Sequence, residues 1–132
     1  MKTPGRWLID TSEWPIVVHA VEGTLTDKQL DEYLKAASSL MEREGDYFAV
    51  MDASHIGSVS ASMRSRIAAW QRQYRPVVEK RCRGVVYVLA TPLLRFIHMT
   101  ILLVTGLAVP YVVCSTRDEG LRWARERLGE HS

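Results

Sequence analysis

Residues 47–70, YFAVMDASHIGSVSASMRSRIAAW, decide the fold that we predict from this sequence. The stretch opens with a short apolar run over residues 47–51 and then reaches Asp52. A small, polar loop with His55 follows, and a helical pattern begins at Ser62. A buried strand that leads through a loop into a helix is the geometry that places ligand and regulatory sites at the carboxyl end of an open α/β sheet.

The composition is that of one globular domain. The chain has 132 residues, 47% of them hydrophobic, which predicts one core and one domain over residues 1–132. The net charge of +2 and the 24% of charged residues call for no nucleic-acid or membrane partner. Cys82 and Cys114 have neither metal-ligand nor CxxC spacing, and the chain starts without an apolar leader segment. We therefore expect a reduced, cytoplasmic protein without a cofactor.

One segment has nearly the length of a membrane span. Residues 96–114 carry no formal charge, and about 20 apolar residues are enough to cross a bilayer. His98, Gly106 and Pro110 interrupt the run, and its pattern changes from helix-like to strand-like near Gly106. We interpret the segment as a buried helix followed by a buried strand, and we predict no membrane span.

Strand and helix patterns alternate along the chain. Strands are predicted at residues 6–10, 15–22, 47–51, 84–90 and 109–114, and helices at residues 26–44, 62–78, 91–105 and 116–128. Thr26 and Thr116 each begin a capping box that starts a helix, whereas Pro76 should kink or end the second helix. The order β-β-α-β-α-β-α-β-α predicts an α/β fold with a mostly parallel five-stranded sheet and crossover helices.

This order of elements, over nearly the whole chain, resembles the STAS domain, the fold of the anti-sigma factor antagonists. Residues 22–27, EGTLTD, are similar to the glycine-containing turn before the first helix of those domains. Residues 51–54, MDAS, resemble their strand that ends in Asp-x-Ser. The resemblance implies a STAS-like, non-enzymatic regulatory module that binds a protein partner, such as a kinase or an anti-sigma-like factor.

In the antagonists, a motif of the form Asp-Ser-Ser-Gly opens the following helix, and its serine accepts a phosphate from the partner kinase. The motif falls on residues 60–63, SASM, so the acceptor maps to Ser62. Ser60 replaces the Asp and Met63 replaces the Gly. The chain is therefore more similar to uncharacterised bacterial STAS-like proteins than to a true antagonist.

Three serines, Ser58, Ser60 and Ser62, lie where the second helix starts. Their hydroxyls could simply cap free backbone N–H groups. They are also the candidate phosphoacceptors, because a helix N-terminus favours a phosphate, and Arg64 and Arg66 are close in sequence.

The loop site that we predict after the central strand comprises Asp52, Ser54 and His55. An Asp–His pair could orient a base for nucleophilic chemistry, but such pairs are also common loop hydrogen bonds. No GxSxG motif or second acid accompanies it, so we predict no enzyme. His19 and His98 lack a carboxylate or thiol at ligand spacing, which favours packed histidines over a metal site.

The second helix is locally basic. Arg64, Arg72 and Arg75 could form a patch that binds an acidic protein surface or a phosphate-bearing ligand, or they could be a solvated helix face. Trp70 and Tyr74 fall on the apolar stripe instead, and this argues against nucleic-acid binding.

The predicted third helix is apolar nearly all round, and it includes Phe96, Met99 and Leu103. Such a helix either forms an interface with another chain, most simply in a homodimer, or lines a pocket for an apolar ligand. We expect the interface. The alternative is a small domain that binds an apolar ligand or lipid, of the STAS/SEC14-like kind.

Overall fold

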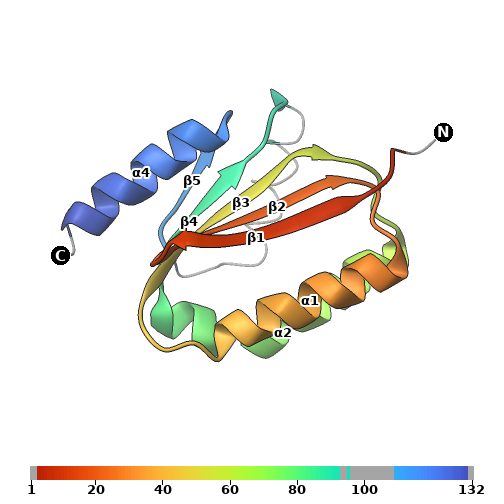
Figure 1. Cartoon of the computed structure of the whole chain (residues 1–132), viewed down its shortest axis with the longest axis horizontal. Helices are drawn as coiled ribbons and strands as arrows, with labels where there is room; N and C mark the ends of the chain where they lie inside the picture. The colour runs from red at the N-terminus through yellow and green to blue at the C-terminus, as the bar shows by residue number, and fades with distance from the viewer. Residues whose placement is uncertain (1–2, 93–94, 96–108, 131–132) are drawn as a thin grey trace.

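The computed structural model describes residues 3–92, 95 and 109–130, which form one sheet with helices on both of its faces (Figure 1). The elements are β1 (Arg6–Glu13), β2 (Ile16–Gly23), α1 (Asp27–Met41), β3 (Tyr47–Ile56), α2 (Ala61–Arg81), β4 (Cys82–Val88), β5 (Tyr111–Cys114) and α4 (Arg117–Glu130). The strands lie in the order β1-β2-β3-β4-β5. Only the β1–β2 pair is antiparallel, so the predicted mostly parallel α/β sheet is confirmed.

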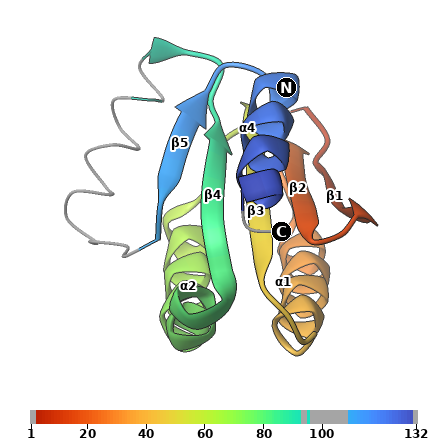
Figure 2. The ribbon, with the colours of Figure 1, turned by 90° about the vertical axis from the view of Figure 1, so that its left-hand side faces the viewer.

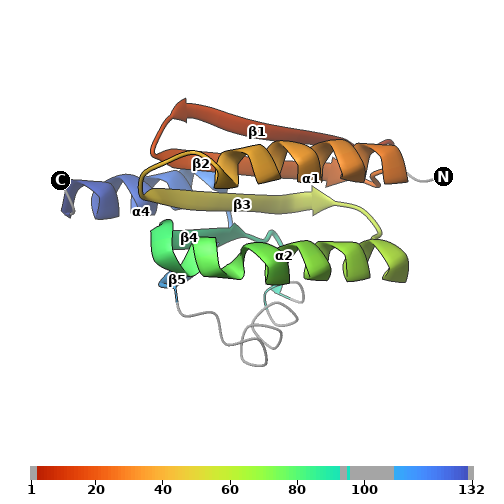
Figure 3. The same cartoon turned by 90° about the horizontal axis from the view of Figure 1, so that it is seen from below.

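Two helices cover one face of the sheet and one helix covers the other. Figures 1 and 3 show α1 and α2 side by side beneath the sheet, whereas α4 crosses the opposite face (Figure 2). The predicted helix over residues 91–105, with Phe96, Met99 and Leu103, lies almost wholly outside the described residues.

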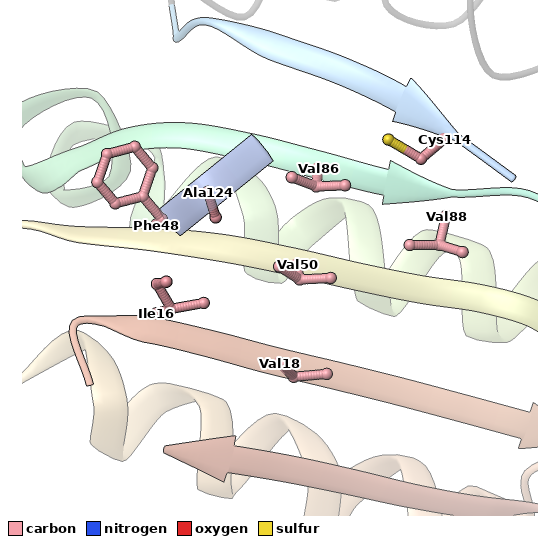
Figure 4. Packing of buried hydrophobic residues seen from close by; sticks show 8 residues of the cluster. All are labelled: Ile16, Val18, Phe48, Val50, Val86, Val88, Cys114 and Ala124. Atoms are coloured by element: carbon pink, nitrogen blue, oxygen red, sulfur yellow. The ribbon is translucent and has the colours of Figure 1, made fainter. Parts of the chain in front are cut away.

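The core is built from both faces of β3. Phe48 and Val50 point toward α4, with exposures of only 2% and 0% (Figure 4). Tyr47 and Ala49 belong to a second buried cluster that includes Cys82 and Val85 of β4. Since successive side chains of a strand point to opposite faces, a strand that is covered on both sides must be apolar at every position, as residues 47–51 are.

Two strands, β1 and β3, extend further than the sequence indicated. β3 does not stop at Asp52, because Glu22 and Gly23 of β2 pair with His55 and Ile56 and hold this part of the chain extended. Ser54 and His55 are therefore strand residues, and the predicted loop is shortened to residues 57–60. In the same way, β1 continues to Glu13, beyond the predicted strand at residues 6–10.

The second helix also continues past its predicted break. α2 includes Pro76 and ends only at Arg81. Proline removes one backbone N–H group, which leaves the carbonyl of Arg72 without its helical donor. Both residues are exposed, so water can satisfy that carbonyl and the helix does not have to end there.

The capping box predicted at Thr26 is confirmed, and of the one predicted at Thr116 the structure shows the bond to the threonine hydroxyl. The Thr26 hydroxyl accepts from the Gln29 N–H (3.1 Å), and the Gln29 side chain accepts from the Thr26 N–H (2.9 Å). Thr116 likewise accepts from the Glu119 N–H (3.2 Å) at the start of α4.

A buried histidine links β2 to α1. His19 is 8% exposed, and its Nδ1 lies 2.9 Å from the Tyr33 hydroxyl. Burial lowers the pKa of His19 to about 4 and raises that of Tyr33 to about 12. His19 is therefore a packed, neutral histidine, as predicted.

α4 approaches the sheet through small residues. Ala124 is fully buried, and a Cβ on Gly120 would lie 2.6 Å from Cγ1 of Val86. A glycine is needed at position 120 because any side chain would push the helix away from β4.

We predict that Gly120→Ala destabilises the fold although alanine is the better helix former. The propensity gain of about 1 kcal/mol is outweighed by overpacking of about 1–3 kcal/mol. Gly129→Ala is the matched control, because a Cβ there meets nothing within 4 Å. Urea unfolding should show a lower midpoint for the first variant only, and an equal gain in both would contradict the close packing.

We also predict acid sensitivity that depends on His19. The unfolded chain binds this proton near the ordinary pKa of 6.5 and the folded chain only near 4. Stability is therefore full above about pH 6.5 and falls by about 3 kcal/mol as the pH decreases toward 4. His19→Gln should flatten this part of the curve of unfolding free energy against pH. Identical curves for the wild type and for His19→Gln would refute the claim that burial of neutral His19 causes this acid sensitivity.

Candidate functional site

Two helices start next to each other at the carboxyl end of the sheet. β2 leads into α1 and β3 leads into α2, and Gly23 pairs with Ile56 at the ends of these parallel strands. The two helix N-termini therefore lie at the same end of the molecule (Figure 3). We call residues 23–26 and 57–63 the α1–α2 corner.

The corner is held together by close backbone contact. The Gly57 N–H donates to the Gly23 carbonyl at 2.7 Å. A Cβ on Gly57 would lie 2.6 Å from the Thr24 hydroxyl oxygen, so only glycine allows this approach. The glycine-containing turn before α1 was predicted from the sequence. Its contact with the segment after β3 was not.

The three candidate serines have different surroundings in this corner. Ser58 Oγ lies 3.4 Å from the Thr24 hydroxyl. Ser60 is the N-cap of α2, and its hydroxyl accepts from the Met63 N–H at 3.1 Å. Ser62 lies in the first turn of α2, exposed, and its side chain has no hydrogen bond within the part of the chain that the structure describes.

An open hollow is lined in part by two of these serines, Ser58 and Ser60. It has a volume of about 240 Å³ and is lined by Thr24, Leu25, Ser58, Val59, Ser60 and Met63. The lining combines hydroxyl groups with apolar side chains. Such a surface can accommodate an apolar side chain of a partner protein. Its hydroxyl groups can hydrogen-bond to the partner's backbone beside that side chain.

Asp52 lies in a different environment from the corner. It is 9% exposed, and its Oδ1 accepts from the Ser54 N–H (3.0 Å) and hydroxyl (2.5 Å). Its Oδ2 accepts from Nε of Arg117 at 2.8 Å. Burial acts to raise the pKa of Asp52, but the bonds from Ser54 and Arg117 outweigh it, and the pKa is lowered from its ordinary value.

Within the predicted loop site, Asp52 acts as a structural tether. Asp52 joins β3 to the first residue of α4, and within the described residues no hydrogen bond links it to His55, which is exposed. Sequence analysis missed Arg117, since nothing local connects two residues that are 65 positions apart.

The three arginines of the predicted basic patch, Arg64, Arg72 and Arg75, are exposed but not equivalent. Arg75 pairs with Glu79 at 2.8 Å, and Arg64 donates to the Val59 carbonyl at 2.8 Å. Arg72 is solvent-exposed. Arg66 instead faces α1, where it pairs with Asp27 and Asp31.

The described residues contain neither a metal site nor a membrane-spanning helix. No group of His, Cys, Asp and Glu side chains there could hold a metal ion. No helix among residues 3–92 and 109–130 is long and apolar enough to cross a membrane. Cys82 and Cys114 are buried free thiols, and burial raises the pKa of each.

Comparison with known proteins identifies the fold. No protein-family model matches the sequence, and no curated protein matches it. The structure superposes with a TM-score of 0.71 on that of an uncharacterised protein of the DUF3478 family from Shewanella loihica PV-4, which has a SpoIIAA-like fold. The match covers 94% of this chain and 95% of the other at 11% identity. The chain therefore has the SpoIIAA-like fold of the anti-sigma factor antagonists, as its resemblance to STAS domains predicted.

Proposed function

We propose that the protein is a non-enzymatic regulatory module that binds another protein through the α1–α2 corner. The observation that carries this proposal is the open hollow with both hydroxyl and apolar lining at the start of α2. Ser62 is exposed in the first turn of the same helix. The SpoIIAA-like fold supports a module of this kind. The sequence resemblance to the antagonists implies that Ser62 corresponds to their regulatory serine.

Ser62 is better suited than Ser60 to act as a switch. The Ser60 hydroxyl caps α2, so its modification would remove an acceptor that a helix start needs. A phosphate on Ser62 would lie in the first turn, where the helix dipole and free N–H groups favour negative charge. It would change the charge at the start of α2 and leave the Ser60 cap in place.

The exposed arginines extend the same surface along α2. Arg64, Arg72 and Arg75 would suit a partner with an acidic face, such as a kinase or an anti-sigma-like factor. Arg64 is the nearest of them to Ser62 in sequence, so modification of this serine would alter the charge of the surface at its amino-terminal end.

Apolar-ligand binding is the second candidate. An apolar cavity of about 70 Å³ lies between the sheet and the helices, lined by residues that include Val21, Leu30, Ile56 and Ile67. Small-molecule sites commonly enclose about 300–1,000 Å³. The cavity is too small for a lipid, and the interaction module is therefore the better proposal.

A photocrosslinking residue placed at position 62 tests the proposal in native cells. We expect an adduct with a discrete partner protein from position 62, and no such adduct from the control position Glu126, which is exposed on α4. Phosphopeptide mapping of the wild-type chain from native cells should find Ser62 phosphorylated in the fraction that does not co-purify with that partner.

Identical adducts from both positions would refute binding through the corner. If position 62 gives a specific adduct but the wild-type chain carries no phosphate on Ser62, the protein is still an interaction module, but the phosphorylation switch is refuted.

A further inference from the structure

β1 forms a free edge of the sheet. Figures 2 and 3 show it at the opposite edge from β5, and no described segment lies outside it. Its pairing with β2 is regular from Arg6 to Asp10 and shifts register before Glu13. Pro4, which has no backbone N–H group, lies just before the regular stretch. The edge that can pair is therefore short and is centred on Leu8.

The side chains along this stretch alternate between the two faces. Arg6, Leu8 and Asp10 lie on one face, and Trp7 and Ile9 lie on the other, where Trp7 contacts Tyr33 of α1. Leu8 is 49% exposed, and with Tyr111 it is one of the two large hydrophobic residues that are exposed within the described part of the chain. The Arg6 side chain is 81% exposed, and it pairs with Glu22 at 3.0 Å on the neighbouring strand.

This arrangement is complementary to itself. If two copies of β1 pair antiparallel about a two-fold axis at Leu8, this residue faces Leu8 of the partner subunit. Arg6 then faces Asp10 of the partner subunit, and Asp10 faces Arg6 of the partner subunit. Directly opposed side chains in antiparallel strands have Cβ atoms about 4.5–5.5 Å apart, close enough for both charge pairs and the leucine contact.

We propose that β1 is a homodimerisation edge, through which two copies join their sheets into one continuous sheet. The pairing satisfies the outward backbone groups of both edges and covers Leu8, and the two ion pairs fix the register.

Charges on an edge strand can also serve to prevent pairing. Protection of that kind works best with charges of one sign, which repel when two copies meet. Here the charges are opposite and equally spaced from the central leucine. In the two-fold register each Arg6 faces an Asp10 of the other copy, so both charge pairs attract and no like charges face each other. This interface does not use the α1–α2 corner, so the proposal stands or falls independently of the proposed function.

Charge reversal tests the register directly. Sedimentation velocity on the full chain should show a dimer that grows with concentration. In a dimer of the Arg6→Asp variant two carboxylates face each other, and in a dimer of the Asp10→Arg variant two guanidinium groups face each other. Each variant alone should therefore dimerise at least about tenfold more weakly. An equimolar mixture of the two variants restores both attractive pairs, and it should form a heterodimer. Thermal unfolding of each variant confirms that it is folded.

A second measurement does not depend on the charges. Leu8→Cys should form an intersubunit disulfide under mild oxidation, because the two-fold axis brings these positions together. Ser12→Cys is the matched control, since Ser12 is exposed on the same strand beyond the regular stretch.

The proposal would be overturned by a monomeric wild-type chain at several hundred micromolar. It would also be overturned if the single variants dimerise as well as the wild type, which would place the interface elsewhere, or if the mixture of variants remains monomeric.

Discussion

The structure depends on β3 being buried on both faces. Phe48 and Val50 pack toward α4, and Tyr47 and Ala49 pack into the opposite cluster, so neither helix layer can form a core without this strand. The order β2-β3-β4 then determines where the helices go. Because crossovers between parallel strands are right-handed, two successive crossovers in the same direction place α1 and α2 on the same face. Their N-termini consequently meet at one corner of the molecule, where the candidate site lies (Figure 3).

Much of the fold could be predicted because its signals are local. The apolar run of β3, the Thr26 capping box and the alternation of strands with helices are all contained in short stretches of sequence. The features that escaped prediction are tertiary. The polar residues Ser54 and His55 look like a loop, yet pairing with β2 keeps them in the strand. The candidate serines were found from sequence, but their different hydrogen bonds were not, since these depend on where Thr24 and α2 lie.

The candidate site combines a rigid strand with a less buried helix. Within α2, all of whose residues the structure describes, no side chain is fully buried. The helix is attached to α1 by the Arg66 ion pairs and by the bond from Trp70 Nε1 to the Ser38 hydroxyl (2.9 Å). Segments with few buried apolar contacts open locally at low cost in free energy, which suits a surface that responds to a partner or to a phosphate.

Native-state hydrogen exchange, resolved by residue, tests this account most directly. Because β3 is buried on both faces, we expect the amides of residues 47–51 to exchange only through global unfolding and to be the most protected in the chain. The amides of α2 should exchange faster, through local opening that leaves the sheet intact. Protection of α2 equal to that of β3, or faster exchange in β3, would contradict the claim that this strand organises the fold.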